Sequence, residues 1–290
     1  MIRSLVVVSA IVSACAFRMP FSSRSRMAPI MQQIGQGRAP PGMKPRPDGT
    51  FGVAGEHLPQ YVLEMDNGAK AMVRTYGCNV YTWTTANGVE IMGAAPGADP
   101  IADNGPYLGG AAHIFPSEEA CFTDRMKFIP EERAKKLSFD RMIFKCEPGP
   151  ETSSFPAKFE YRCDVTLRDS SMEWDVVLIN KGDAPYDCTL GINTNFAISS
   201  ASAVTISGLG GDLSITGPCN DLYTGIEGPV TITDSGKGQK LTLTQKGYGD
   251  YVVASDGTNL MVMPFKSTPV TIPVGKYKET KFYFKVDVSS

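Results

Sequence analysis

A two-residue period of apolar side chains is the feature that most constrains how this chain of 290 residues can fold. Apolar residues occupy alternate positions from Phe159 to Leu167, and the same period returns from Met172 to Leu178. This pattern is typical of a β-strand that turns one face to a core and the other to solvent. Two such runs, close together along the chain, predict antiparallel strands.

Shorter runs of similar character predict further strands over residues 62–65, 71–76, 80–84, 189–198, 230–233, 240–246, 251–254, 260–263 and 281–288. Sequences rich in Asn, Asp and Gly, which favour turns, occur at residues 66–68, 86–88, 181–183, 234–236 and 255–257. One helix-like segment, residues 130–136, begins with Pro, then carries acids and then bases, and is long enough for one or two turns. We therefore expect an all-β protein, a large antiparallel β-sandwich with few short helices.

The domain organisation follows from the change of composition near residue 50. Hydrophobic residues make up 42% of the chain, enough for a sizeable core, and no break in composition occurs within residues 51–290. We expect this stretch to form a single domain.

The N-terminal segment has the composition of a targeting leader. Residues 1–16 contain Arg3, a short apolar run and an Ala-Cys-Ala end, which predicts a signal peptide. Residues 17–50 begin with Phe17 and are rich in Ser and Arg, with no acid before Asp48, as in a transit peptide. Together they resemble the bipartite leaders of algae with secondary red plastids, such as diatoms, and predict a plastid protein of the stroma or the thylakoid surface. The alternative is a secreted protein with a disordered, basic arm.

The charge distribution argues against a nucleic-acid partner, and the hydropathy argues against a transmembrane segment. Residues 1–47 hold seven basic residues and no acid, and the remainder carries 21 basic and 30 acidic residues. A surface that negative repels phosphate backbones, so we expect no nucleic-acid partner. The signal-like apolar run is too short to span a bilayer, and no later run is longer, so we expect no transmembrane segment.

Six cysteines remain beyond the leader, without a C-x-x-C motif or a dense framework. Cys163 and Cys188 lie within apolar runs, where a free cysteine behaves as a small hydrophobe. This distribution predicts reduced thiols and neither a disulfide scaffold nor a zinc site. No motif implies a metal or an organic cofactor.

Several segments, in order from residue 51 to the C-terminus, resemble the hexose-6-phosphate mutarotase branch of the aldose 1-epimerase, or galactose mutarotase-like, family. The segments are Tyr76–Trp83 with the turn Gly88–Glu90, Gly109–Pro116, Leu137–Arg141, Val177–Pro185, Leu190–Ala197, Gly208–Gly211 and Gly228–Asp234. No single motif is strong, but their shared order is fairly specific. The resemblance implies a large twisted antiparallel β-sandwich, in agreement with the strand pattern.

The activity that the resemblance implies is interconversion of sugar anomers. A glutamate removes the proton of the anomeric hydroxyl while a histidine protonates the ring oxygen, and the family uses two histidines and one glutamate. In this sequence Leu137 and Asn193 occupy the two histidine positions, and Met263 occupies the glutamate position. Leucine and methionine cannot transfer protons, and asparagine can only form hydrogen bonds. In addition, Leu108 replaces an arginine that the family uses to hold substrate.

Three residues remain candidates for binding a sugar or sugar phosphate. Arg141 keeps its family position and either grips a phosphate or forms a structural ion pair. His113, one of two histidines in the chain, either contacts a sugar or is a strand-end residue satisfied by the backbone; His57 lies in a loop before the first expected strand. Asn193 either orients a sugar hydroxyl or merely fills the former histidine position.

Two functions follow as expectations. The first is a catalytically inactive mutarotase-like protein, a binding or structural subunit in the plastid, by analogy with a degenerate family member in a thylakoid complex of plant chloroplasts. Its expected contact region is Ser117–Lys136, which has no close family counterpart. The alternative is an active glucose-6-phosphate 1-epimerase with rearranged residues, using Arg141 for phosphate and His113 with a displaced carboxylate such as Glu227. A sugar-binding module without turnover is a third, weaker option.

Overall fold

A computed structural model describes residues 60–94, 109–117, 126–131, 140–152, 158–275 and 278–289, single residues 121, 123 and 155, and the backbone of residues 43–45 and 50–53. The expected signal peptide and most of the transit-like segment lie outside the described residues, as do His57, Leu108 and Leu137.

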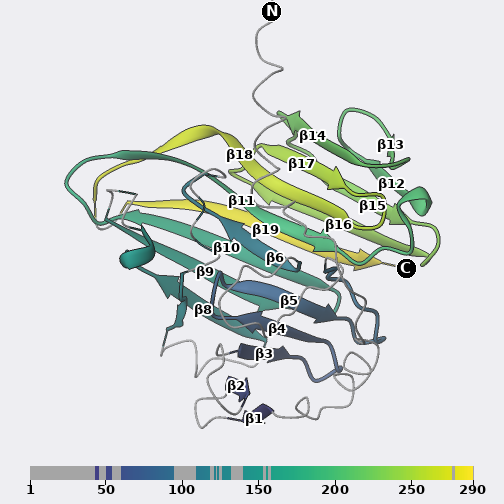
Figure 1. The fold of residues 1–290 in the computed structure, drawn as a ribbon, viewed down its shortest axis with the longest axis horizontal. Coiled ribbons are helices and arrows are strands. Elements are labelled where there is room, and N and C mark those ends of the chain that lie inside the picture. Colours follow the sequence, from purple (N-terminus) through teal and green to yellow (C-terminus); the bar gives the residue numbers. More distant parts are fainter. Residues whose placement is uncertain are drawn as a thin grey trace, which may run out of the picture.

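Two antiparallel sheets make up the fold (Figure 1). In the described part of the chain, the ten-stranded sheet has the order β1-β2-β3-β4-β5-β6-β11-β18-β17-β14. Its strands are β1 (Met43–Pro45), β2 (Thr50–Val53), β3 (Gln60–Glu64), β4 (Lys70–Arg74), β5 (Asn79–Thr84), β6 (Ala111–Ile114), β11 (Tyr186–Phe196), β18 (Leu260–Ile272), β17 (Asp250–Ser255) and β14 (Cys219–Thr224).

The nine-stranded sheet has the order β13-β12-β15-β16-β19-β10-β9-β8-β7. Its strands are β13 (Leu213–Ser214), β12 (Val204–Ser207), β15 (Val230–Asp234), β16 (Gln239–Lys246), β19 (Glu279–Ser289), β10 (Ser171–Asn180), β9 (Phe159–Leu167), β8 (Arg141–Cys146) and β7 (Ile129–Pro130). The only helical elements among the described residues are two 3-10 turns, η4 (Pro150–Thr152) and η5 (Ala201–Ala203). The expected all-β sandwich with few short helices is confirmed.

The segment 130–136, which the sequence predicts to be helix-like, begins in the structure with a strand residue. Pro130 closes strand β7 and pairs with Phe144, so it does not open a helix. Glu131 follows as irregular chain, and residues 132–139 lie outside the described ones. Pro130 can occupy β7 because this strand is at the edge of the sheet, where a missing N–H costs no ladder bond.

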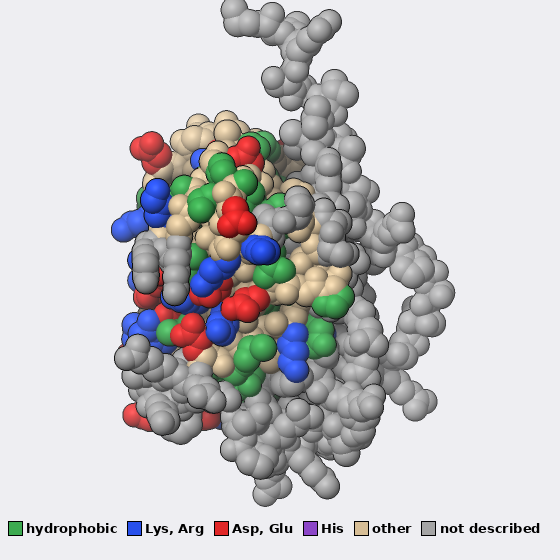
Figure 2. Space-filling view, turned by 90° about the vertical axis from the view of Figure 1, so that its left-hand side faces the viewer, with side chains coloured by type: hydrophobic (Ala, Val, Ile, Leu, Met, Phe, Trp, Pro, Cys, Tyr) green, Lys and Arg blue, Asp and Glu red, His purple; other side chains and the backbone are tan. Residues whose placement is uncertain are grey.

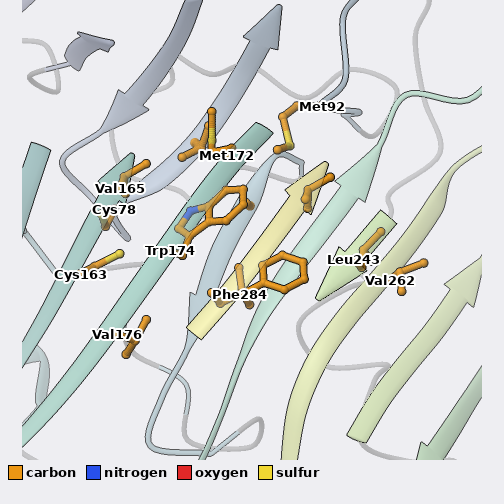
Figure 3. Packing of buried hydrophobic residues seen from close by; sticks show 14 of the residues in the cluster. Cys78, Met92, Cys163, Val165, Met172, Trp174, Val176, Leu243, Val262 and Phe284 are labelled. Carbon is orange, nitrogen blue, oxygen red and sulfur yellow. The ribbon is translucent and has the colours of Figure 1, made fainter. Parts of the chain in front are cut away.

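One core fills the space between the two sheets. Along β16, buried residues alternate with more exposed ones, as the apolar alternation in the sequence predicts. In the core, Trp174 of β10 stacks on Phe284 of β19 with ring centroids 5.4 Å apart. Figure 3 shows these two rings in the core, together with Val262 from the opposite sheet. Burial of such large side chains supplies most of the favourable free energy of folding.

The six cysteines beyond the leader are all free thiols, as the sequence predicts. Four of them are buried. Burial raises the pKa of Cys188 to about 12, so this thiol is chemically inert at neutral pH.

The turn at residues 255–257 shows how a polar side chain sets a hairpin. The carboxylate of Asp256 accepts hydrogen bonds from the backbone N–H groups of Thr258 and Asn259, both at 2.7 Å, and from the Asn259 side chain at 2.9 Å. These donors, opposed by partial burial, lower the pKa of Asp256 to about 2. The turn joins β17 to β18, which pair with each other.

Candidate functional site

The candidate site lies on the outer face of the ten-stranded sheet, the face turned away from the nine-stranded sheet. Strand β11 defines this face, because Ile192 and Phe196 belong to the core between the sheets while Asn193 and Asn195 alternate with them. Successive side chains of a strand point to opposite faces, so the two asparagines point outward.

Strand register brings together on this face Asn193 and Met263, which the sequence resemblance predicts to occupy two of the three catalytic positions. Gly191 pairs with Phe265 and Asn195 pairs with Met261, so Asn193 lies opposite Met263 on β18. Asn193 also pairs with Ala112 of β6, and Met263 pairs with Val252 of β17. The row that crosses the sheet through the candidate site is therefore largely apolar.

Met263 belongs to a separate apolar cluster, which we call the outer-face cluster. Its members are Ile114, Val252, Ala254, Met261, Met263 and Phe265, with Cys121 and Leu222 packed against them. Met263 is only 1% exposed, and the most exposed member, Phe265, is 7% exposed. The described residues around Met263, which the resemblance matches to the family glutamate, thus form a buried apolar cluster.

The side chains of Asn195 and Asp250, two polar residues of this face, form hydrogen bonds within the protein. The Asn195 side-chain amide donates to Asn193 Oδ1 at 3.0 Å and to the Gly110 carbonyl at 3.3 Å. The carboxylate of Asp250, the first residue of β17, accepts hydrogen bonds from the backbone N–H groups of Gly225 at 3.0 Å and Ser267 at 3.2 Å, and from the Ser267 hydroxyl. Asn193 can orient a hydroxyl, but neither asparagine can transfer a proton.

His113 lies on the other face of the same sheet. It pairs with Ile192 on β11, and both side chains point into the space between the sheets. The side chain is 1% exposed, and its Nδ1 lies 2.8 Å from the Tyr161 hydroxyl on β9 of the opposite sheet. The structure therefore does not bring His113 together with Asn193.

Arg141 belongs to the nine-stranded sheet, on β8. Its guanidinium Nε donates to the two carboxylate oxygens of Asp164 at 2.9 and 3.0 Å, and Nη2 also contacts this carboxylate. This ion pair raises the pKa of Arg141. Asp164 alternates along β9 with core residues Cys163 and Val165, so the pair lies on the outer face of the nine-stranded sheet. The full thickness of the sandwich separates it from Asn193.

Two carboxylates that the motifs singled out have different surroundings. Glu227, the carboxylate suggested for a rearranged site, is exposed in the loop between β14 and β15. Glu90, at the end of a family-like turn, accepts hydrogen bonds from the Trp83 N–H at 2.9 Å and the Thr84 hydroxyl at 3.0 Å. Burial raises the pKa of Glu90, although these donors oppose the change. Its hydrogen bonds give it a structural role at the end of β5.

Charged side chains of both signs are intermixed on the surface. Arg162 contacts Glu160 at 2.8 Å and Glu131 at 3.3 Å, and Lys181 contacts Glu160 at 2.9 Å. Figure 2 shows blue and red side chains interspersed on one side of the molecule, rather than a continuous basic patch. Among the described residues, no helix is long and apolar enough to cross a membrane.

The structure also assembles a cluster that the sequence spacing did not indicate. Cys78, His113 and Cys163, far apart in the sequence, have potential ligand atoms that all lie within 4.8 Å of one another. Burial, reinforced by the neighbouring Cys78, raises the pKa of the Cys163 thiol. No short motif connects these residues, so only the fold could reveal them.

The two sheets and their order define a β-sandwich of the galactose mutarotase-like class, the fold shared by aldose 1-epimerase homologues. The mutarotase candidate YeaD from Salmonella typhimurium superposes with a TM-score of 0.71 at 13% identity, over 83% of this chain and 94% of its own. A galactose mutarotase related enzyme from Lactobacillus acidophilus gives 0.67 at 13% identity, over 80% and 97%. The protein Slr1438 from Synechocystis sp. PCC 6803 gives 0.66 at 16% identity, over 79% and 95%. No family model and no curated protein matches the sequence.

Proposed function

We propose that this protein has a mutarotase fold without mutarotase activity, and that it serves as a binding or structural subunit in a plastid. One observation carries the proposal. Met263, which the resemblance matches to the family glutamate, is buried in the outer-face cluster opposite Asn193, which the resemblance matches to a family histidine. Neither side chain can accept or donate the proton that anomerisation moves.

The surroundings support the same conclusion. General acid–base catalysis needs an acid and a base that flank the same sugar carbon, each with a pKa near the working pH. His113, the one histidine among the described residues, is held in the core by Tyr161. Arg141, the candidate phosphate ligand, is paired with Asp164 on the opposite outer surface of the sandwich. An active site of the family type would need these groups on the face of Asn193.

For the partner contact we propose the segment Ser117–Lys136. Its described part includes β7, the last described strand of the nine-stranded sheet, where Pro130 offers no N–H to a further strand, so a partner would be contacted there by side chains. Ile129 in this strand is 56% exposed, the largest exposed fraction among the large hydrophobic residues described. An apolar side chain at an open sheet edge supports a protein partner, and by analogy we propose a thylakoid complex.

The catalytic part of the proposal is tested by anomer exchange. We expect the purified protein to leave the exchange between α and β anomers of glucose 6-phosphate and galactose at the buffer rate, because Asn193 and Met263 cannot transfer protons and the Asp250 carboxylate is held by Gly225 and Ser267. Exchange is measured by NMR, with an active mutarotase as positive control. Exchange well above the buffer rate would establish the alternative, an active glucose-6-phosphate 1-epimerase-like enzyme. In that case Arg141→Ala and Asn193→Ala would identify which face binds the sugar.

The cellular part is tested in a diatom. A fluorescent protein fused behind residues 1–50 should accumulate in the plastid, because this leader combines a signal peptide with a transit-like segment. The full-length protein should comigrate with a membrane complex on a native gel of plastid membranes. Secretion of the fusion contradicts the plastid assignment, and a purely monomeric stromal species contradicts the role as a subunit.

A further inference from the structure

Three potential metal ligands meet in the core, beneath the face that carries the candidate site. Cys78 comes from the turn between β4 and β5, His113 from β6, and Cys163 from β9 of the opposite sheet. Their ligand atoms lie within 4.8 Å of one another, and none of the three residues is more than 1% exposed. Figure 3 shows the side chains of Cys78 and Cys163 close to each other in the core.

The histidine is oriented as a metal ligand would be. Its Nδ1 is 2.8 Å from the Tyr161 hydroxyl, and its ring stacks on Phe128 with centroids 6.2 Å apart. The other nitrogen, Nε2, is buried without a hydrogen bond to a nitrogen or oxygen atom, and the imidazole lies against the Cys163 thiol. Metal-binding histidines commonly have one nitrogen fixed by a hydrogen bond while the other coordinates the ion. A buried ring nitrogen without such a bond is otherwise unfavourable, because burial has removed its hydration.

The backbone at Cys78 is also unusual. This residue has a φ of +46°, the one positive φ among the described residues other than glycine. This conformation is unfavourable for a residue with a Cβ atom, because the Cβ approaches the following carbonyl oxygen. The conformation is retained in a turn that directs a thiol into the core beside Cys163, and such outliers are concentrated at functional sites.

We propose that Cys78, His113 and Cys163 bind a thiophilic d10 metal ion, Zn²⁺ or Cu⁺. Two sulfurs and one imidazole nitrogen form a soft ligand set that suits these ions and not Mg²⁺ or Ca²⁺, which require oxygen ligands. With two thiolates, Zn²⁺ gives a neutral site, which favours it in an apolar core. Three protein ligands instead match the low coordination number of Cu⁺, whereas structural zinc is almost always four-coordinate.

The location of the site gives the ion a structural role. It would connect the β4–β5 turn and β6 of the ten-stranded sheet to β9 of the nine-stranded sheet. An ion that binds the folded state alone stabilises that state by mass action. Because the ligands are fully buried, the ion would enter during folding, so loading should need refolding rather than simple addition.

To test the proposal, the full-length reduced chain is refolded in the absence of oxygen, either with Zn²⁺ or with Cu⁺. Loosely held ions are then removed by desalting. Elemental analysis should find about one ion per chain that is absent from the Cys163→Ala and Cys78→Ala variants. Cys188→Ala removes a buried cysteine outside the cluster and should retain the ion. The arm that retains metal identifies the ion, and X-ray absorption should report two sulfur ligands and one nitrogen ligand.

A second measurement keeps the test independent of the folding of the variants. At about a hundredfold excess over the dissociation constant, the ion should raise the melting temperature of the unmodified chain by roughly 5–10 °C relative to the metal-free chain. Refolding that leaves both ions unbound overturns the proposal, as does equal retention by Cys163→Ala and Cys188→Ala. A Cys78–Cys163 disulfide in the protein as isolated from cells would also overturn it, since oxidised sulfurs no longer offer two thiolates.

Discussion

Replacing Gly110 with alanine should lower the free energy of unfolding by about 2–5 kcal/mol, because the substitution combines two unfavourable effects. Gly110 has a φ of +66°, which is unfavourable for a residue with a side chain. A Cβ atom there would lie 2.3 Å from the Val80 carbonyl oxygen and 2.7 Å from the Tyr81 Cα. Both contacts are with backbone, so relief would require β5 and β6 to separate.

Gly210→Ala is the matched control for this prediction. Gly210 has a φ of +90°, but a Cβ atom would meet nothing within 4 Å. Gly210→Ala should therefore lower the free energy of unfolding by about 1–2 kcal/mol, the contribution of the unfavourable backbone conformation alone. Urea unfolding of both variants measures the difference. If both variants lose the same free energy of unfolding, β5 and β6 can separate without cost. The close approach at Gly110 is then not important for stability.

Gly110 also matters for the candidate site. Its carbonyl accepts hydrogen bonds from the backbone N–H of Asn195 at 2.8 Å and from the Asn195 side chain at 3.3 Å. Asn195 in turn donates to Asn193. The glycine pair 109–110 of the family-like motif is thus explained by backbone packing that positions the outer face, with no need for a catalytic role.

The fold could be predicted from the sequence where alternation was strong. Strands β9, β10, β16 and β19 each turn one face to the core, and all four lie where the period of two placed them. The alternation did not reveal β6, which has four residues, three of them buried. It also missed β14, because an edge strand with little burial has no clear apolar face.

Sheet membership could not be deduced from turn residues. The sequence predicts a turn at residues 181–183, but it does not reveal that β10 and β11 on either side of this turn belong to different sheets. The turn chemistry itself is real, since the Asn180 side chain accepts from the Gly182 N–H at 2.8 Å and donates to the Ala184 carbonyl at 2.9 Å. The same side-chain amide also donates to the Ile272 carbonyl on β18 at 3.0 Å, which connects the two sheets. A turn motif specifies a local reversal of the chain and not the partner of the following strand.

The candidate site shows a similar limit. A linear alignment can match Asn193 and Met263 to family positions, but only strand register places them opposite each other. It can also identify His113 as a scarce imidazole without revealing which face of β6 the side chain occupies. The association of His113 with Cys78 and Cys163 depends on contact between two sheets, which no sequence spacing encodes.

Replacing Met263 with glutamate, the residue type at this family position, should destabilise the protein by about 4 kcal/mol at pH 7. The side chain is 1% exposed among apolar neighbours, so an ionised carboxylate would lose its hydration without gaining a partner. Burial would raise the pKa of the new glutamate above its value in the unfolded chain. The folded state would then bind the proton more tightly, so the stability of the variant relative to the unmodified protein should be highest below about pH 4 and fall as the pH rises toward the raised pKa.

Met263→Leu is the control, because it changes shape but not polarity and should cost less than about 1.5 kcal/mol. Chemical unfolding at pH 4 and pH 7 compares the variants. If Met263→Glu is as stable as Met263→Leu at pH 7, then water reaches this position and the outer face is an open cleft that can accept a sugar. If the pH-dependent loss occurs, the position is too dry to hold an ionised base. Under the proposed function, the difference from an active mutarotase would then include the packing around Met263 as well as the substitutions, and introducing the glutamate alone would not create activity.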